Sequence, residues 1–149
     1  KCALALQHGA THAINYRSED FVARVREITG GAGVKEVYDS VGKDTFMKSL
    51  DCLAPFGLLA SFGQSSGNVD AFNPGVLAQK GSLFLTRPTL VTYGAKRENL
   101  VAMAKELFEV VQSGAVKINV NQTYPLKDAA KAHADLAARK TTGSTVLLV

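Results

Sequence analysis

The sequence predicts an α/β fold, in which the strands of a parallel sheet alternate with helices. Short apolar stretches alternate with stretches of helical periodicity along the 149 residues, and neither a linker nor a fixed-period repeat divides them. Residues 58–62 are nearly all apolar, as in a strand that is covered on both faces. The hydrophobic share of 46% is too high for a disordered chain, and no apolar run approaches the roughly 18 residues of a membrane span.

The elements follow from local signals, taken in chain order. The first residues are typical of a helix end that Gly9 closes, and residues 13–16 predict a short strand. Ser18 is expected to be the N-cap of a helix that stops at Gly30 and Gly31. The other predicted strands are at 34–39, 58–62, 82–86, 118–120 and 144–149. The other predicted helices are at 45–53, 95–112 and 126–138, with a helical turn at 74–79. Pro55 is expected to end the first of these helices, and the second is expected to bury a stripe of Leu100, Ala104, Leu107 and Val111.

The net charge, the cysteines and the histidines limit the ligands and the cellular compartment that the sequence predicts. The formal net charge of +4 is compatible with a phosphate-bearing ligand, but it is too small and too scattered to indicate a nucleic acid alone. Cys2 and Cys52 cannot form a disulfide framework, so a reducing compartment, the cytoplasm, is expected. No metal site is expected, because His8, His12 and His133 form no i, i+4 pair and no ligand cluster.

Two glycine motifs suggest chemistry that their surroundings do not support. The glycines at 30–33 leave a helix and enter a strand, whereas a dinucleotide loop does the reverse, so they indicate a helix stop. Residues 63–67 match the G-x-S-x-G nucleophile elbow, with His133 as a nominal base. The elbow needs a helix directly after its serine, and residues 68–74 are a poor helix start, so a hydrolase is a minor alternative.

Polar loops follow two neighbouring strands at the point where each strand ends. Residues 39–42 leave the strand at 34–39, residues 63–67 leave the strand at 58–62, and Tyr16 ends the strand before them. Open parallel sheets bind ligands at this carboxyl edge. The loops therefore indicate a crevice for a flat, polar ligand such as a nucleotide, with plain connecting loops as the alternative.

Five stretches of the chain carry a family resemblance: Ile14 to Arg17, Val37 to Gly42, Ser61 to Gly67, Lys80 to Pro88 and Tyr124 to Ala129. Together they resemble the NADPH:quinone oxidoreductases. These are the zeta-crystallin relatives in the zinc-independent part of the medium-chain dehydrogenase/reductase superfamily. The resemblance covers essentially the whole chain, in order and with nearly matching spacing.

The resemblance implies a Rossmann-type, doubly wound parallel sheet that lacks its first strands. Residues 1–90 would be part of an NADPH-binding domain, and residues 91–149 would be C-terminal helices and strands that pack partly with a catalytic domain. That domain would precede Lys1, so the chain would be the C-terminal portion of the enzyme and inactive alone. The implied reaction is hydride or single-electron transfer from NADPH to a quinone or related enone.

The resemblance also implies roles along the cofactor, with no side-chain acid or base. Lys1, Tyr16 and Arg139 would hold the adenosine 2′-phosphate and so select NADPH over NADH, because a phosphate dianion attracts cations and hydroxyl donors. Ser40 would approach the adenosine. The residues that would follow the cofactor to its nicotinamide are Phe62, Gly63, Gln64, Ser65, Arg87, Pro88 and Thr89.

The expected partners follow from the fold and from the family. The apolar strand at 82–86 is last in its series, so it predicts a sheet edge through which a homodimer pairs. The other expected partner is a small quinone, without a membrane or a nucleic acid. The alternative is a structural crystallin-like or RNA-binding role, which the lack of a basic stripe with interleaved aromatics disfavours.

Overall fold

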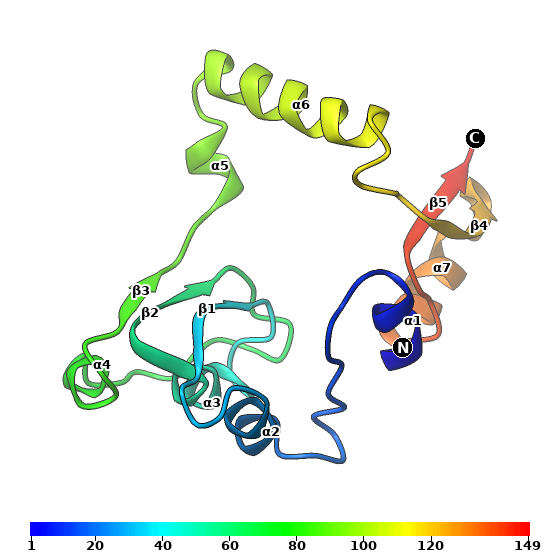
Figure 1. The fold of residues 1–149 in the computed structure, drawn as a ribbon. Helices are drawn as coiled ribbons and strands as arrows, with labels where there is room; N and C mark the ends of the chain where they lie inside the picture. The colour runs from blue at the N-terminus through cyan, green and yellow to red at the C-terminus, as the bar shows by residue number, and fades with distance from the viewer. The chain divides into compact units, whose positions relative to one another are not determined.

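The computed structural model describes residues 1–149 as two compact units. The N-terminal unit contains residues 2–92, and the C-terminal unit contains residues 93–149 together with Lys1. Each unit has a parallel sheet of its own (Figure 1). The first has the strand order β1-β2-β3, and the second consists of β4 and β5. The predicted α/β class with parallel strands is confirmed.

The strands of the N-terminal unit end at one edge of its sheet. Its elements are α1 (Cys2–Gln7), α2 (Phe21–Ile28), β1 (Val34–Asp39), α3 (Phe46–Asp51), β2 (Leu53–Ser61), α4 (Gly75–Gln79) and β3 (Phe84–Thr86), followed by α5 (Leu90–Tyr93) where the chain passes to the second unit. Asp39 pairs with Ser61, and Ala60 pairs with Thr86. The loops that follow the three strands therefore start at the same level.

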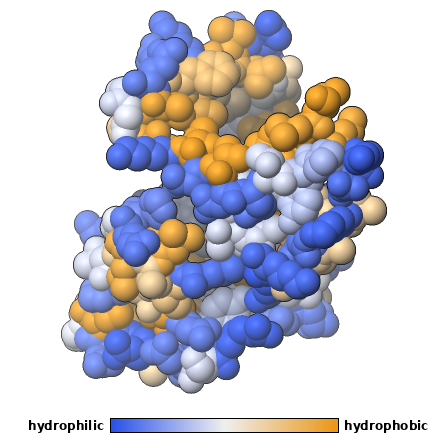
Figure 2. All heavy atoms as spheres, turned by 90° about the vertical axis from the view of Figure 1, so that its right-hand side faces the viewer, coloured by the Kyte–Doolittle hydropathy of each residue, from blue (hydrophilic) through white to orange (hydrophobic).

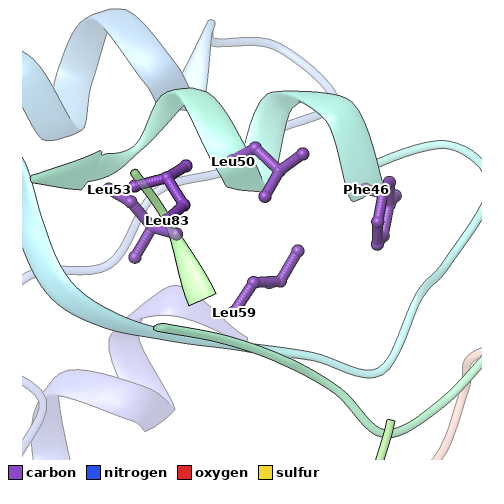
Figure 3. Packing of buried hydrophobic residues seen from close by; sticks show 5 residues of the cluster. All are labelled: Phe46, Leu50, Leu53, Leu59 and Leu83. Atoms are coloured by element: carbon purple, nitrogen blue, oxygen red, sulfur yellow. The ribbon is translucent and has the colours of Figure 1, made fainter. Parts of the chain in front are cut away.

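One hydrophobic core holds the N-terminal unit together. Figure 3 shows Phe46 and Leu50 of α3 facing Leu53 and Leu59 of β2 and Leu83, which precedes β3. Each of these five side chains is at most 6% exposed. Burial of one such side chain stabilises the fold by roughly 1.5–3 kcal/mol. The core thus fixes α3 on β2 and sets the position of the loop between β1 and α3.

The helices of this unit cover only one face of its sheet. Successive residues of a strand point to opposite faces, so Tyr38 and Phe84 lie away from the core that Leu59 enters. They are 69% and 60% exposed. Ala60, on the same face as Tyr38, is nevertheless only 6% exposed. The expectation that the strand at 58–62 is covered on both faces therefore holds for Leu59 and Ala60, whereas Tyr38 and Phe84 on the neighbouring strands are open.

The C-terminal unit has almost no interior. It consists of α6 (Arg97–Gln112), β4 (Val120–Pro125), the 3₁₀ helix η1 (Leu126–Asp128), α7 (Ala129–Ala137) and β5 (Ser144–Leu148). Only Ala132 and Thr141 are buried. Leu100 and Leu107, in the expected buried stripe of α6, are 44% and 53% exposed, because no other element packs extensively against this helix. Figure 2 illustrates the many hydrophobic residues that lie open on the surface of the chain.

Residues 13–15 have no regular structure instead of forming the predicted strand, and a turn follows at residues 16–18. The Ser18 N–H donates to the Asn15 carbonyl, and no strand pairs with this segment. A strand needs a hydrogen-bonded neighbour, whereas Asn favours turns. Asp20, and not Ser18, is the N-cap of α2, because its carboxylate accepts the Val22 N–H at 3.0 Å.

Helix α3 is shorter than predicted, and β2 is longer. The helix ends at Asp51, and the strand starts at Leu53 and includes Pro55, which the sequence predicts to end the helix. The pairing of β1 with β2 is irregular between Val34 and Glu36. Pro55 lies opposite this irregularity, where the missing N–H of a proline is tolerated.

Two further strands differ from the prediction. β3 begins at Phe84 because Ser82 has a φ of 55°, outside the extended region. β4 starts where the predicted strand ends, at Val120, and continues through Gln122 and Thr123, which pair with β5. Polar residues of this kind are common in loops, so the sequence did not distinguish them from a strand.

Candidate functional site

The site lies at the carboxyl edge of the three-stranded sheet, where two loops are joined. We call residues 40–45, after β1, and residues 62–67, after β2, the rim loops. The Ser65 N–H donates to the Ser40 carbonyl at 3.2 Å. The Ser66 N–H and its hydroxyl both donate to the Val41 carbonyl at 2.8 Å. These bonds bring the two predicted polar loops together as one surface.

Two glycines allow the rim loops to approach this closely. A Cβ on Gly63 would lie 2.5 Å from the Ser40 carbonyl oxygen, which no real side chain tolerates. Gly42 has a φ of 89°, and a Cβ there would lie 2.8 Å from the Gly67 carbonyl oxygen. The rim loops therefore meet backbone to backbone, and any side chain at these positions would separate them.

Two hollows open beside the rim loops. The smaller, of about 240 Å³, is lined by Tyr16 and Ser40 among others. The larger, of about 470 Å³, is lined by Gly63, Gln64 and Arg87 together with apolar side chains. The structure thus places five of the predicted site residues of the N-terminal unit in two groups, Tyr16 with Ser40, and Gly63 and Gln64 with Arg87.

The other predicted site residues of this unit are exposed or lack a ligand-like arrangement. Phe62 is 50% exposed in its rim loop, and Ser65 is exposed beside it. After β3, Arg87 donates to the Pro88 carbonyl at 3.3 Å, and the Thr89 hydroxyl bonds that of Thr92. Phe62, Ser65, Arg87 and Thr89 are therefore open to a ligand.

Lys1 and Arg139 belong to the C-terminal unit, whereas Tyr16 belongs to the N-terminal unit. Arg139 follows α7 with a φ of 58°, in the left-handed region where glycine is favoured. The Lys140 N–H donates to the Asp135 carbonyl across this residue at 3.0 Å, as in a helix C-cap. The ion pairs of this segment use Lys131 and Lys140, and no ion pair of the chain uses Arg139.

The Asp135 carboxylate forms ion pairs with both of these lysines. Lys131 donates to its carboxylate at 2.8 Å, Tyr124 at 3.1 Å, and Lys140 lies 3.3 Å away. The hydrogen bond from Lys131, then that from Tyr124, lower the pKa of the Asp135 carboxyl to about 2. This cluster ties the end of α7 to β4, and the Arg139 side chain takes no part in it.

Sequence reasoning missed the most buried charged group at the rim. Asp39 is 3% exposed, and its carboxylate accepts N–H groups from Val41 and Gly42 and hydroxyls from Thr45 and Ser49. Burial alone would raise the pKa of the Asp39 carboxyl, but these hydrogen bonds lower the pKa below its ordinary value. An Asp at the end of a strand, two residues before the first of these N–H donors, is a recognisable turn signal.

Comparison with known proteins decides the family. A family model described as "Zinc-binding dehydrogenase" matches residues 8–147. The chain belongs to this family. The predicted resemblance to quinone oxidoreductases and the predicted Rossmann-type fold are also confirmed, by the relatives described next.

Three relatives illustrate the similarity of this zinc-binding dehydrogenase family member. A quinone oxidoreductase of Pseudomonas aeruginosa is 55% identical over 148 residues, which are 99% of this chain and 46% of the relative. A 2-haloacrylate reductase of a Burkholderia species is 47% identical, over 99% of this chain and 45% of the relative. The crystal structure of Escherichia coli quinone oxidoreductase complexed with NADPH matches with a TM-score of 0.91 and 51% identity, over 99% of this chain and 46% of that one. The chain spans about half the length of these relatives.

The residues of this family member do not fit a zinc ion, despite the family description. A zinc site needs three or four Cys, His, Asp or Glu ligands around one point. The structure has no group of three or more such side chains that could hold a metal ion. Cys52 is buried, and burial raises the pKa of its thiol to about 11, which disfavours the thiolate that binds zinc.

The structure also contains no helix with the length and apolar character that a membrane span needs.

Proposed function

We propose that the chain is the NADPH-binding part of an enzyme that reduces quinones. The observation that carries this proposal is the pair of rim loops, joined backbone to backbone beside two hollows at the carboxyl edge of a parallel sheet. The names of the relatives supply the substrate class, and the NADPH complex of a protein of 51% identity supports the cofactor.

The residues at the rim fit a dinucleotide. Gly63 and Gly42 leave space that a Cβ would fill, so the backbone can approach a flat ligand. The smaller hollow offers the hydroxyl groups of Tyr16 and Ser40 to an adenosine. The larger hollow combines Arg87 with an apolar wall that suits an aromatic ring. The rim loops are thus matched to a ligand that is polar at one end and partly apolar at the other.

Selection of NADPH over NADH is assigned to cations near the adenosine. Lys1 and Arg139 carry the charges, and Tyr16 adds a hydroxyl donor. A 2′-phosphate is a dianion, and a guanidinium binds it by paired, charge-assisted hydrogen bonds. The absence of an ion-pair partner for Arg139 supports this role, because the guanidinium is available to a ligand. The meeting of these three residues around one phosphate is part of the proposal.

The remaining assigned residues follow the cofactor towards its reactive end. Bound NADPH would supply the hydride or the electron that reduces the quinone or a related enone. The chain itself would bind and orient the cofactor through Phe62, Gly63, Gln64, Ser65, Arg87, Pro88 and Thr89, and none of its side chains is assigned as an acid or base. The Burkholderia relative is named for a haloacrylate, which, like a quinone, has a C=C bond activated by a carbonyl group.

The domain and partner assignments complete the proposal. Residues 1–90 would serve the cofactor, and residues 91–149 would pack partly with a catalytic domain. A homodimer would form through β3, whose Phe84 is 60% exposed and whose backbone pairs with β2 on one side only. We place the enzyme in the cytoplasm, because its two cysteines are both free.

A cofactor titration tests the proposal in the full-length protein. Arg139→Ala or Lys1→Ala should weaken NADPH binding about tenfold or more and leave NADH nearly unchanged, since a lost charge-assisted contact corresponds to about that factor. Lys105→Ala removes an exposed cation of α6 and is the matched control, with no change for either cofactor. Equal losses for NADPH and NADH would contradict the 2′-phosphate assignment, and no NADPH binding by the unmodified protein would overturn the function.

A further inference from the structure

The Asp39 side chain joins the end of β1 to the start of α3. Its Oδ1 accepts the N–H groups of Val41 at 2.8 Å and Gly42 at 3.0 Å. Its Oδ2 accepts the hydroxyls of Thr45 and Ser49, both at 2.8 Å. The first rim loop is therefore wrapped around one carboxylate, with the N–H groups of Val41 and Gly42 turned inward.

The backbone of the same residue reaches the second rim loop. The Asp39 carbonyl accepts the N–H of Phe62 at 2.9 Å and that of Gly63 at 3.3 Å. Ser40, which lines the smaller hollow, follows directly. Asp39 is thus the one residue whose side chain holds one rim loop and whose carbonyl holds the other.

A carboxylate at this position is not explained by packing alone. It is buried, and no lysine, arginine or histidine pairs with it. Removing a charge from water without a partner charge is unfavourable, and here only hydrogen bonds offset it. An apolar side chain would avoid that cost, but it would leave the N–H groups of Val41 and Gly42 without an acceptor. The loop shape, rather than the core, therefore accounts for the Asp.

We propose that Asp39 is a positioning residue, which holds both rim loops in the shape that accepts the cofactor. This inference rests on the proposed function. Asp39 itself lines the smaller hollow, but both oxygens of its carboxylate are engaged by protein donors, so the carboxylate acts through Ser40 and Gly63. Because these residues serve the part that NADPH and NADH share, Asp39 sets the affinity for both, whereas the cations at the 2′-phosphate set the difference between them.

Substitution of Asp39 in the full-length protein tests the inference. Asp39→Ala should raise the KM and the Kd for NADPH and for NADH about tenfold, because two buried N–H groups lose their acceptor. Asp39→Asn keeps one acceptor oxygen, and the hydroxyls of Thr45 and Ser49 can turn to accept its amide. This variant should recover most of the affinity, with a residual loss of about threefold because the lost charge weakens the bonds. In both variants KM should change more than kcat.

Thr29→Val is the matched control. The Thr29 hydroxyl accepts the Gly33 N–H at 2.9 Å, in the loop before β1 and thus at the opposite end of the same strand. Its loss should lower the unfolding temperature and leave both KM values unchanged. A purely structural Asp39 would behave like Thr29, with a lower unfolding temperature and unaltered cofactor affinity.

The outcomes separate the two proposals. If the unmodified protein binds neither cofactor, the proposed function fails. If it binds them and the folded Asp39 variants bind them equally well, or if Thr29→Val weakens binding as much, only the positioning role is overturned. Should Asp39→Ala not fold, Asp39→Asn decides alone: a loss for both cofactors supports the role, and unchanged affinity for both overturns it.

Discussion

The two units differ in how much of their apolar surface they bury. The N-terminal unit encloses Leu50 and Leu59 completely, whereas the C-terminal unit leaves Leu107 and Phe108 of α6 more than half exposed. Since roughly 25 cal/mol is gained per Å² of apolar surface removed from water, the first unit gains more stability from its own packing than the second. The second carries apolar surface that its own elements do not cover, and such surface marks a site of interaction.

The largest expected difference between the two units is in the stability lost when a leucine side chain is truncated to alanine. In the 149-residue chain, Leu50→Ala should lower the free energy of unfolding by about 2–5 kcal/mol, because it leaves a cavity under α3. Leu107→Ala should change it by no more than about 0.5 kcal/mol, as for other exposed positions. Denaturant unfolding measures both, and equal losses would contradict the contrast.

The same pair of variants sharpens the contrast in the full-length protein. If a catalytic domain covers α6, the loss for Leu107→Ala should become larger there than in the 149-residue chain, while the loss for Leu50→Ala should stay the same. An unchanged, small effect of Leu107→Ala would argue against the proposed packing of residues 91–149.

Acid sensitivity should be the second largest difference between the units. The pKa of Asp39 is lowered in the folded state, so its contribution is fully present above its unfolded pKa of about 4 and is lost as pH falls below it. The free energy of unfolding of the unmodified protein should therefore fall on acidification below about pH 4. The difference in this free energy between the unmodified protein and Asp39→Asn should become smaller over the same range.

Asp135 provides the comparison in the C-terminal unit. Its pKa of about 2 follows chiefly from the hydrogen bond with Lys131, whose side chain is exposed. Surface ion pairs of this kind contribute little and are screened by salt. Asp135→Asn should thus change the acid response less than Asp39→Asn, and the reverse order would show that the C-terminal cluster matters more for stability.

The smallest expected effect concerns Arg139. Its φ of 58° suits glycine, so Arg139→Gly should raise the free energy of unfolding by about 0.5–1 kcal/mol while it weakens NADPH binding. Thermal unfolding and a cofactor titration on the same sample measure the two changes. A variant that is less stable, or that binds NADPH normally, would show that the arginine is kept for another reason.

The sequence predicted the elements that depend on local signals. The strand at 34–39 was predicted with its observed bounds, since Gly33 precedes it and a turn follows it. Residues 13–16 were predicted wrongly, because an apolar run forms a strand only beside a neighbouring strand. Similarly, Leu100 and Leu107 have helical spacing, and that spacing predicts a helix without showing what covers it.

The residues of the candidate site likewise divide into those that local signals predict and those that depend on the packing of the folded chain. Ser40, Gly63 and Gln64 were recognisable because they leave strands at the carboxyl edge, and the structure brings their loops together. Asp39 was not predicted to be a site residue, because nothing in the neighbouring sequence shows that the hydroxyls of Thr45 and Ser49 donate to its carboxylate. That arrangement depends on how α3 packs against β2, which only the folded chain reveals.

Hydrogen–deuterium exchange of the full-length protein, with and without NADPH, tests the central claim most directly. We predict that NADPH slows exchange at residues 40–45 and 62–67, the two rim loops, and leaves residues 29–33 at the opposite end of β1 unchanged. Protection confined to residues 29–33, or no protection of either rim loop at saturating NADPH, would contradict the account.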